Sequence, residues 1–199
     1  MPMGSISLTE KFEAALLYAY RLHANQLRAD GKTPYIAHLM SVAALVLESG
    51  GDEDETIAAL LHDAIEDQGR ERTRQAIQHQ FGDRVTQIVS GCTEPAPSLP
   101  LMWRDRKMQY LEQLRYAPLS VKRVVVADKL HNLRSLLASL HQEGPGVWEW
   151  FHSGQAETLW FYQALWNLFQ GWEPGWEGNY WIKAYRQALV ELELLSTSA

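Results

Sequence analysis

Four ionisable residues follow an apolar run in residues 58–69, AALLHDAIEDQG. His62 and Asp63 stand side by side, and Glu66 and Asp67 follow as a second pair. On a helix, residues four positions apart share a stripe of the surface, so the second pair would lie one turn beyond the first. Three carboxylates beside one imidazole would repel one another in a protein interior unless a divalent cation held them together. The segment therefore predicts a metal site of imidazole and carboxylate ligands. Such ligands suit a Mn, Fe, Zn or Ni ion, whereas a structural zinc site is closed and rich in thiolates.

Two further residues interrupt apolar helix faces and could complete this ligand set. His38 follows the turn GKTPYIA at the start of a helical segment, and Asp128 interrupts the apolar run RVVVADKL, where an unpaired carboxylate would be costly. With His62 and Asp63 they form a two-histidine, two-aspartate set that leaves positions open for water or substrate, as in catalytic sites. The prediction depends on His38 and Asp128, because a histidine–aspartate dipeptide alone is often a simple surface feature. Four other histidines are not expected to be ligands: His79, His131, His141 and His152.

Helical periodicity runs through most of the chain. Ser7–Glu10 fits a capping box that opens the first helix, and Pro118 suits the first turn of a long helix. Since no strand pattern, internal repeat or linker is found, the sequence predicts an all-α fold of about nine helices in a single domain over 1–199. Further helices are expected over 36–48, 54–66, 71–80, 83–92, 103–115 and 120–140, with two more in the tryptophan-rich tail at 146–195, and loops over 93–100 and 171–179.

Composition and charge exclude several classes of protein. The chain has 199 residues, 46% of them hydrophobic and 21% charged, which indicates a globular chain rather than a disordered one. Its formal charge of -6 opposes binding to nucleic acid, and no apolar run reaches the roughly 20 residues that cross a bilayer. One cysteine, Cys92, and an N-terminus without signal-peptide features predict a cytoplasmic location. The tail tryptophans are expected to pack as core, although they leave room for a homodimer surface.

The order of these ligand candidates resembles that of the HD phosphohydrolase superfamily. The segments HANQLRADGKTPYIAH, HDAIED and ADKLHNLRSL are similar to the hydrolase domains of RelA/SpoT homologues, including small stand-alone alarmone hydrolases. The resemblance covers about residues 10–170 and implies a helical domain that binds one Mn2+-like ion. It also implies removal of the 3′-pyrophosphate from guanosine tetra- or pentaphosphate (ppGpp or pppGpp), which gives GDP or GTP and pyrophosphate. The metal ligands that it implies are His38, His62, Asp63 and Asp128.

The resemblance assigns further roles near the metal. Glu66 and Asp67 match the family's acid/base pair, and Arg28 matches a residue that packs on the guanine. Other matches, to residues that line the ribose and phosphate side and to a basic pair, are Asn132, Ser135, Arg106 and Lys107. The helical spacing agrees for two of these. Asn132 and Ser135 lie four and seven positions after Asp128, so the three residues share one stripe of the helix and would face the same cleft.

One departure from the family concerns the residue after Arg28. The family commonly has a basic residue there, whereas this chain has Ala29. The lost cation favours another phosphorylated nucleotide, such as a nucleoside phosphate or NADPH, as the alternative substrate. A non-catalytic nucleotide-binding module is a third reading, which the intact ligands and acid/base pair disfavour. Replacement cations could come from Lys32 or from a cluster that could equally be a solvated helix start, Arg104, Arg106 and Lys107.

Overall fold

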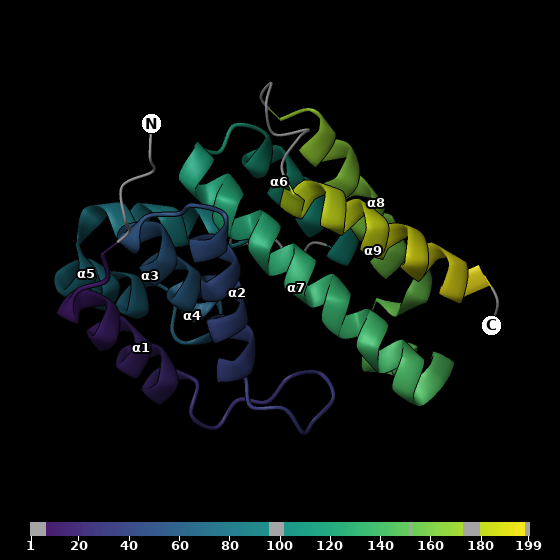
Figure 1. The fold of residues 1–199 in the computed structure, drawn as a ribbon, viewed down its shortest axis with the longest axis horizontal. Coiled ribbons are helices and arrows are strands. Elements are labelled where there is room, and N and C mark those ends of the chain that lie inside the picture. The colour runs from purple at the N-terminus through teal and green to yellow at the C-terminus, as the bar shows by residue number, and fades with distance from the viewer. Residues whose placement is uncertain (1–6, 96–101, 152, 173–179, 198–199) are drawn as a thin grey trace. The chain divides into compact units, whose positions relative to one another are not determined.

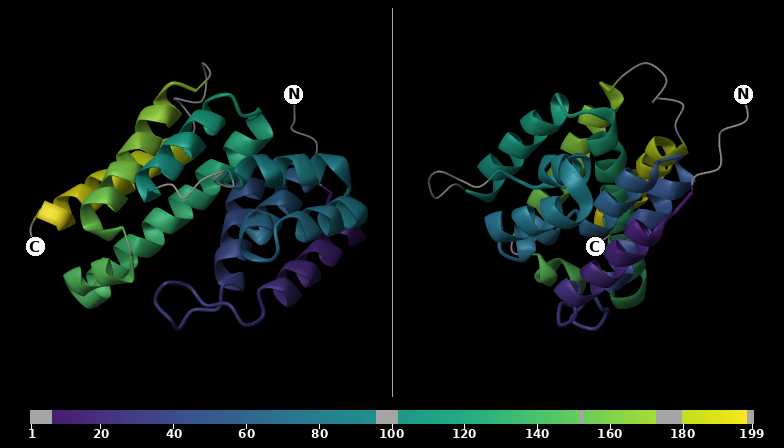
Figure 2. Two further views of the ribbon diagram at one scale, coloured as in Figure 1. Left: turned by 180° about the vertical axis from the view of Figure 1, so that it is seen from behind. Right: turned by 90° about the vertical axis from the view of Figure 1, so that its left-hand side faces the viewer.

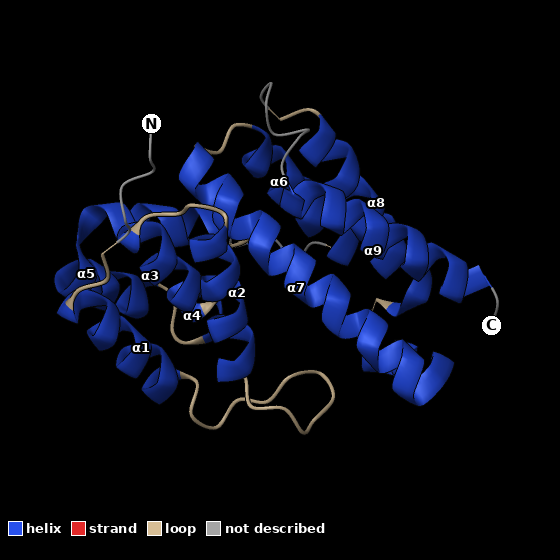
Figure 3. Ribbon diagram, viewed as in Figure 1, coloured by secondary structure: helices blue, strands red, loops and turns tan. Residues whose placement is uncertain are grey.

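The computed structural model describes residues 7–95, 102–151, 153–172 and 180–197, and within these ranges it holds helices and no strand (Figure 3). The predicted all-α fold is therefore confirmed for the described residues. One isolated bridge joins Leu27 and Pro34 in the loop after the first helix. The helices, most of them labelled in Figure 1, are α1 (Glu10–Leu22), α2 (Ile36–Glu48), α3 (Glu53–Leu61), α4 (Ala64–Asp67), α5 (Glu71–Cys92), α6 (Trp103–Arg115), α7 (Leu119–Glu143), the 3-10 helix η1 (Gly144–Trp150), α8 (Gly154–Gln170) and α9 (Tyr180–Thr197).

Helix α7 contributes to both of the compact units into which the chain divides. The first unit takes the described residues up to Thr93 together with Ala117–Ala127. The second takes Glu94–Tyr116 and the described residues from Asp128 onward. The expectation of one domain over 1–199 stays a prediction.

Helix α3 is the centre of the first unit, because it packs against α1, α2 and α5 (Figure 1). Its first turn carries a capping box, in which the side chains of Asp52 and Glu55 each accept the other's backbone N–H. The residues that follow, Thr56–Leu61, are all buried. Since the helix is enclosed on every side up to its end, the next residue, His62, also enters the interior.

Two expected helix starts and ends near this core are wrong. Helix α1 begins at Glu10, and its N-cap is Thr9, whose hydroxyl accepts the N–H of Lys11. The capping box that the sequence predicts from Ser7 is therefore not formed. The helix expected over 54–66 ends at Leu61 and resumes as the single turn α4, with the histidine–aspartate pair in the break between them.

The two helices expected over 71–80 and 83–92 are joined end to end as α5. Gly82 separates them, because its φ of 87° and ψ of 175° leave the helical path. A positive φ is strained for residues with a Cβ and is readily adopted by glycine. The prediction of a break at this glycine is confirmed.

Aromatic side chains fill much of the second unit, in which α8 packs against α6 and α9 (Figure 2). Tyr185 of α9 is fully buried, and its hydroxyl donates to the carbonyl oxygen of Tyr162 at 2.9 Å. Phe161 and Leu165 of α8 are buried as well, as the periodicity of the tail predicts. Of the described tail tryptophans, Trp148 and Trp172 are buried, whereas four are only half-buried, so core packing is confirmed for part of the set: Trp150, Trp160, Trp166 and Trp181.

Some expected features fall on residues outside the described part. These are His152, most of the proline-rich loop at 93–100, and most of the segment at 171–179. Among the residues that are described, no helix is long and apolar enough to cross a membrane.

Candidate metal and catalytic site

The end of α3 holds His62 in the interior of the first unit, where the residue is 3% exposed. Its Nδ1 atom lies 2.8 Å from the carbonyl oxygen of Ala59, one turn earlier. A carbonyl oxygen can only accept a hydrogen bond, so Nδ1 carries the proton. In the neutral imidazole, Nε2 then presents its lone pair, which is the state that a metal ligand needs.

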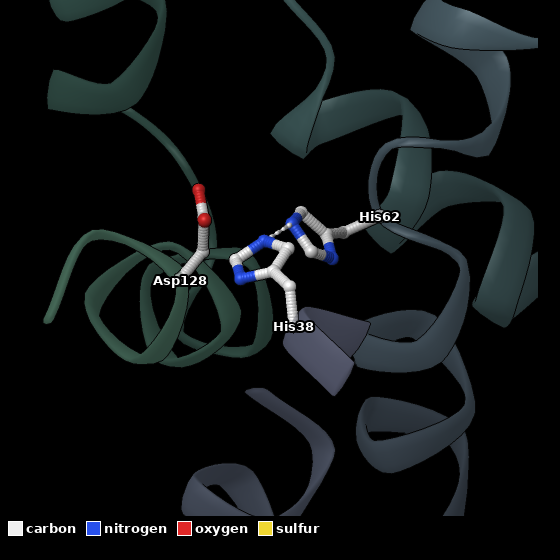
Figure 4. Close-up of side chains that lie close together, drawn as sticks. All are labelled: His38, His62 and Asp128. Carbon is white, nitrogen blue, oxygen red and sulfur yellow. Dashed lines mark hydrogen bonds between the residues drawn. The ribbon is translucent and has the colours of Figure 1, made fainter. Parts of the chain in front are cut away.

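His38 brings a second imidazole to the same point from the first turn of α2. The residue is 1% exposed, and its Nε2 lies 3.3 Å from Nε2 of His62 (Figure 4). The two rings meet edge to face, with their planes at 66°. Both side chains therefore direct the same ring nitrogen toward one small buried volume.

Asp128 is the third member of this group. It directly follows Ala127 on helix α7. Ala127 is the last residue of the first unit on this helix, and Asp128 is assigned to the second unit. One ligand atom each from His38, His62 and Asp128 lie within 4.8 Å of one another, and all three residues are buried (Figure 4). Both carboxylate oxygens of Asp128 have partners on the same helix: Oδ1 accepts from Asn132 Nδ2 at 2.6 Å, and Oδ2 lies 2.7 Å from Lys129 Nζ.

Asp63 approaches the histidines from the break between α3 and α4. Its Oδ2 atom lies 3.1 Å from Nε2 of His62 and 3.6 Å from Nε2 of His38. The same oxygen accepts a hydrogen bond of 2.5 Å from the hydroxyl of Tyr35. Tyr35 therefore fixes the carboxylate of Asp63 beside the two imidazoles.

The chemistry of this donor set fits a first-row divalent cation. Two imidazole nitrogens and two carboxylates converge, and none of the described ligand candidates is a thiolate. Nitrogen and oxygen donors of this kind suit Mn, Fe, Zn or Ni, and the proton on Nδ1 of His62 leaves its Nε2 able to coordinate. The described residues thus contain a candidate site for a divalent metal.

Glu66 and Asp67 lie on the single turn α4, directly after the histidine–aspartate pair. Glu66 is half-buried, whereas Asp67 reaches the surface and accepts a hydrogen bond of 2.7 Å from Gln26 Nε2. Loss of solvation by the atoms packed around its carboxyl raises the pKa of Asp67, and the charge of Asp63 adds to this, while the hydrogen bond from Gln26 opposes it. A carboxyl group with a raised pKa beside a candidate metal site is suited to proton transfer.

Arg28 lies in the loop between α1 and α2, which is folded on itself. Asp30 accepts the backbone N–H groups of Lys32 and Thr33 at 2.8 and 2.9 Å, and these bonds close a turn at Gly31, whose φ is +66°. The guanidinium of Arg28 lies 5.6 Å from the ring centroid of Tyr35. This contact places Arg28 next to the tyrosine that holds Asp63.

The other expected substrate contacts belong to the second unit. Asn132 donates to Asp128, and Ser135 is half-buried further along α7. On α6, Arg106 is half-buried, and Lys107 forms an ion pair with Glu94 and places its Nζ 4.9 Å from the ring centroid of Phe161. Lys107 is therefore not part of a solvated helix start. The binding roles of these residues stay predictions.

Two residues around the site are not predicted by the sequence patterns. Tyr35 bonds Asp63, and Gln26 bonds Asp67 across 41 positions of sequence. Both lie within the quoted motif HANQLRADGKTPYIAH, yet no spacing rule connects them to the carboxylates. A polar residue in a short loop carries no sequence signal for a partner on another helix.

Comparison with known proteins places this site in a family. A model described as "HD domain" matches residues 15–152. A protein of Xenopus tropicalis, named guanosine-3′,5′-bis(diphosphate) 3′-pyrophosphohydrolase MESH1, is 39% identical over 122 residues, which are 60% of this chain and 65% of that protein. A protein of Synechocystis, named probable guanosine-3′,5′-bis(diphosphate) 3′-pyrophosphohydrolase, is 35% identical over 125 residues. The match covers 61% of this chain but only 16% of the Synechocystis protein.

Two solved structures share the fold. Lmo0812 from Listeria monocytogenes has a TM-score of 0.67 and 35% sequence identity, with 76% of this chain and 96% of that chain covered. A metazoan orthologue of SpoT, described as hydrolysing ppGpp, has a TM-score of 0.71 over 98% of both chains, at 22% identity. At that identity, the second likeness concerns the fold alone. The family match over residues 15–152 shows that the chain belongs to the HD domain family.

Proposed function

We propose that the chain is a metal-dependent phosphohydrolase that removes the 3′-pyrophosphate of ppGpp or pppGpp, which leaves GDP or GTP and pyrophosphate. The observation that carries this proposal is the buried group of His38, His62 and Asp128, with a carboxylate pair on the next turn after His62. Relatives at 35% and 39% identity that are named for this activity support the substrate class.

The proposed metal ligands are His38, His62, Asp63 and Asp128, and the proposed ion is Mn2+. A divalent cation bound there would supply Lewis acidity and positive charge at the phosphoryl group. Each histidine offers Nε2, and Tyr35 and Asn132 hold the carboxylates of Asp63 and Asp128 by hydrogen bonds of 2.5 and 2.6 Å. The protein therefore orients both carboxylates through its own donors.

Glu66 and Asp67 would handle the protons of the reaction. Water attacks the phosphorus bonded to the 3′ oxygen, the bond between that phosphorus and the 3′ oxygen breaks, and pyrophosphate leaves. One carboxylate accepts the proton that the water loses, and the 3′ oxygen takes a proton to become the hydroxyl of GDP. Loss of solvation raises the pKa of Asp67, and we propose this residue to hold the proton that is donated.

The nucleotide would be held by local groups, since the chain as a whole carries a charge of -6. Arg28, already stacked against Tyr35, is proposed to pack on the guanine. Further contacts with the ribose and phosphates are proposed for Asn132, Ser135, Arg106 and Lys107. The proposed partner is thus a small nucleotide. That the chain binds neither nucleic acid nor membrane, that it is cytoplasmic and that it forms a homodimer stay predictions.

Ala29 favours a second candidate within the same reaction class. A basic residue at this position would add a cation for the phosphates, and this chain lacks it. Lys107, one possible replacement, is already paired with Glu94. A nucleotide with fewer phosphates, or NADPH, would need less positive charge and is therefore the alternative substrate.

Hydrolysis of ppGpp by the purified chain, with and without Mn2+, tests the proposal directly. Release of equal amounts of GDP and pyrophosphate that requires Mn2+ is expected, and Asp63→Ala is the inactive control. If Mn2+ binds but ppGpp stays intact, the substrate assignment is wrong. A panel of nucleoside phosphates and NADPH then decides whether the second candidate holds.

A further inference from the structure

Gln26, in the loop after α1, connects Asp67 to the interior of the first unit. Its Nε2 donates to Oδ2 of Asp67 at 2.7 Å. Its Oε1 accepts from Nε2 of Gln68 at 2.8 Å and contacts Nδ1 of His23 at 2.7 Å. One amide group therefore joins the surface carboxylate to a buried imidazole.

This network permits one orientation of the Gln26 amide. Reversing it would place the amide oxygen against the carboxylate of Asp67 and the amide nitrogen against the donor of Gln68. Both contacts would be repulsive. With the amide oxygen toward His23, Nδ1 of His23 must be the donor.

His23 is held firmly enough to act as the anchor of this network. The residue is 2% exposed, and its ring stacks on Tyr35 with a centroid distance of 5.3 Å and an angle of 15°. Among the described residues, its Nε2 is buried without a hydrogen-bond partner. An apolar residue would avoid this cost, so packing alone does not explain an imidazole at this position.

The same loop holds the other end of α4. Tyr35 donates to Asp63, the residue that precedes α4, and Gln26 donates to Asp67, its last residue. The backbone links the two donors, because the N–H of Tyr35 bonds the carbonyl oxygen of Gln26 at 2.9 Å. The loop therefore sets the positions of two carboxylates together, one beside the histidines and one at the surface.

We propose that Gln26 is a positioning residue that holds the carboxylate of Asp67 in one orientation for proton transfer, and that His23 fixes the amide of Gln26. This inference rests on the proposed function, because it needs Asp67 to act on a substrate. Asp67, Gln26 and Gln68 line a cavity of about 480 Å³. A carboxylate on the wall of such a space would rotate without a donor, and it would then spend less time aligned with the reacting oxygen.

Gln26→Met tests the positioning role, because methionine is similar in length and makes none of the three hydrogen bonds of the amide. We expect kcat for ppGpp hydrolysis to fall about 10- to 100-fold, with KM and Mn2+ affinity close to those of the wild-type chain. Gln78→Met, which removes a similar bond from an exposed glutamine to Asp83 on α5, is the control and should leave all three unchanged. An unchanged kcat, or Mn2+ affinity that is lost in parallel with kcat, would overturn the proposal.

Two substitutions of His23 separate positioning from simple packing. Asparagine can place a donor near the position of Nδ1, whereas leucine fills space without one. We expect His23→Leu to lower kcat as Gln26→Met does, and His23→Asn to recover most of it. Equal losses of kcat in the two variants would exclude the role of His23.

Nuclear magnetic resonance of the metal-free full chain gives a readout that does not depend on activity. The side-chain amide protons of Gln26 should exchange slowly with water in the wild-type chain and in His23→Asn, and faster in Asp67→Ala and His23→Leu. Fast exchange in the wild-type chain would overturn the network itself. Slow exchange without any hydrolysis of ppGpp would instead overturn the proposed function, and with it the catalytic part of this inference, while the held carboxylate would stand.

Discussion

Nδ1 of His62 lies 2.8 Å from the carbonyl oxygen of Ala59, so helix α3 itself sets the tautomer of the histidine that follows it. The lone pair on Nε2 is consequently directed toward His38, 3.3 Å away, by bonds that belong to the fold. The orientation of this ligand candidate therefore does not require a bound ion, and metal binding and folding should be separable.

Removal of metal should leave the helical fold in place. We expect the chain treated with a chelator to keep its helical circular dichroism, and added Mn2+ to raise Tm, since a ligand at about 100 times its Kd stabilises the folded state by about 2.7 kcal/mol. Asp63→Ala and Asp128→Ala should abolish this rise and the activity together. Glu112→Ala, which removes an exposed carboxylate on α6 that pairs with nearby Arg115, is the control. A normal Mn2+ response in Asp128→Ala would exclude that residue as a ligand.

Glu66→Ala should separate proton transfer from metal binding. Glu66 lies on α4, one turn beyond His62, and is proposed as an acid/base group rather than a ligand. We expect Mn2+ affinity to be retained and turnover of ppGpp to fall by about 10² to 10⁴. Calorimetric titration with Mn2+ and steady-state kinetics measure the two effects. A variant that no longer binds Mn2+ would show that Glu66 is itself a ligand.

Asn132→Ala distinguishes two roles for this amide. Its Nδ2 donates to Oδ1 of Asp128 at 2.6 Å, so we expect its loss to weaken Mn2+ binding by about 10- to 100-fold. The family resemblance instead implies a contact with the nucleotide. If KM for ppGpp rises while Mn2+ affinity stays the same, the contact with substrate is the one that matters.

The ion pair at the start of α3 should make stability depend on pH. Arg84 bonds Asp52 at 2.6 and 2.9 Å, and this hydrogen bonding lowers the pKa of Asp52 below its ordinary value. A lowered carboxyl pKa stabilises the fold above the pKa of the unfolded chain, and the contribution disappears as pH falls through the folded pKa. Because the pair is about half exposed, Arg84→Met should lower the free energy of unfolding at pH 7 by at most about 1 kcal/mol.

Urea unfolding of the wild-type chain and Arg84→Met over a range of pH checks this. The two should differ at neutral pH and converge in acid, below the folded pKa of Asp52. Arg74→Met is a matched control on the same helix, since Arg74 pairs with Glu71 within one turn of α5 rather than with another helix. A difference between wild type and Arg84→Met that persists in acid would mean that packing, not the ion pair, is lost.

Local patterns of the sequence were enough to predict several elements. Helix α2 spans residues 36–48 and α6 spans 103–115, as their periodicity and flanking breakers predict. The conspicuous polar residues on apolar faces, His38 and Asp128, are also the ones that the structure brings close to His62. These predictions succeed because helix periodicity and the cost of burying an unpaired polar group are properties of neighbouring residues.

Only the tertiary structure decided how the carboxylates around the histidines are held. The break at His62 and Asp63 interrupts a segment that is helical by local propensity, and the partners Tyr35–Asp63 and Gln26–Asp67 are 28 and 41 positions apart. The sequence by itself therefore determined which residues could form the site. The packing of α3 against α1 and α2 decided which of them are oriented by which partner, because distant hydrogen bonds depend on packing that no local period encodes.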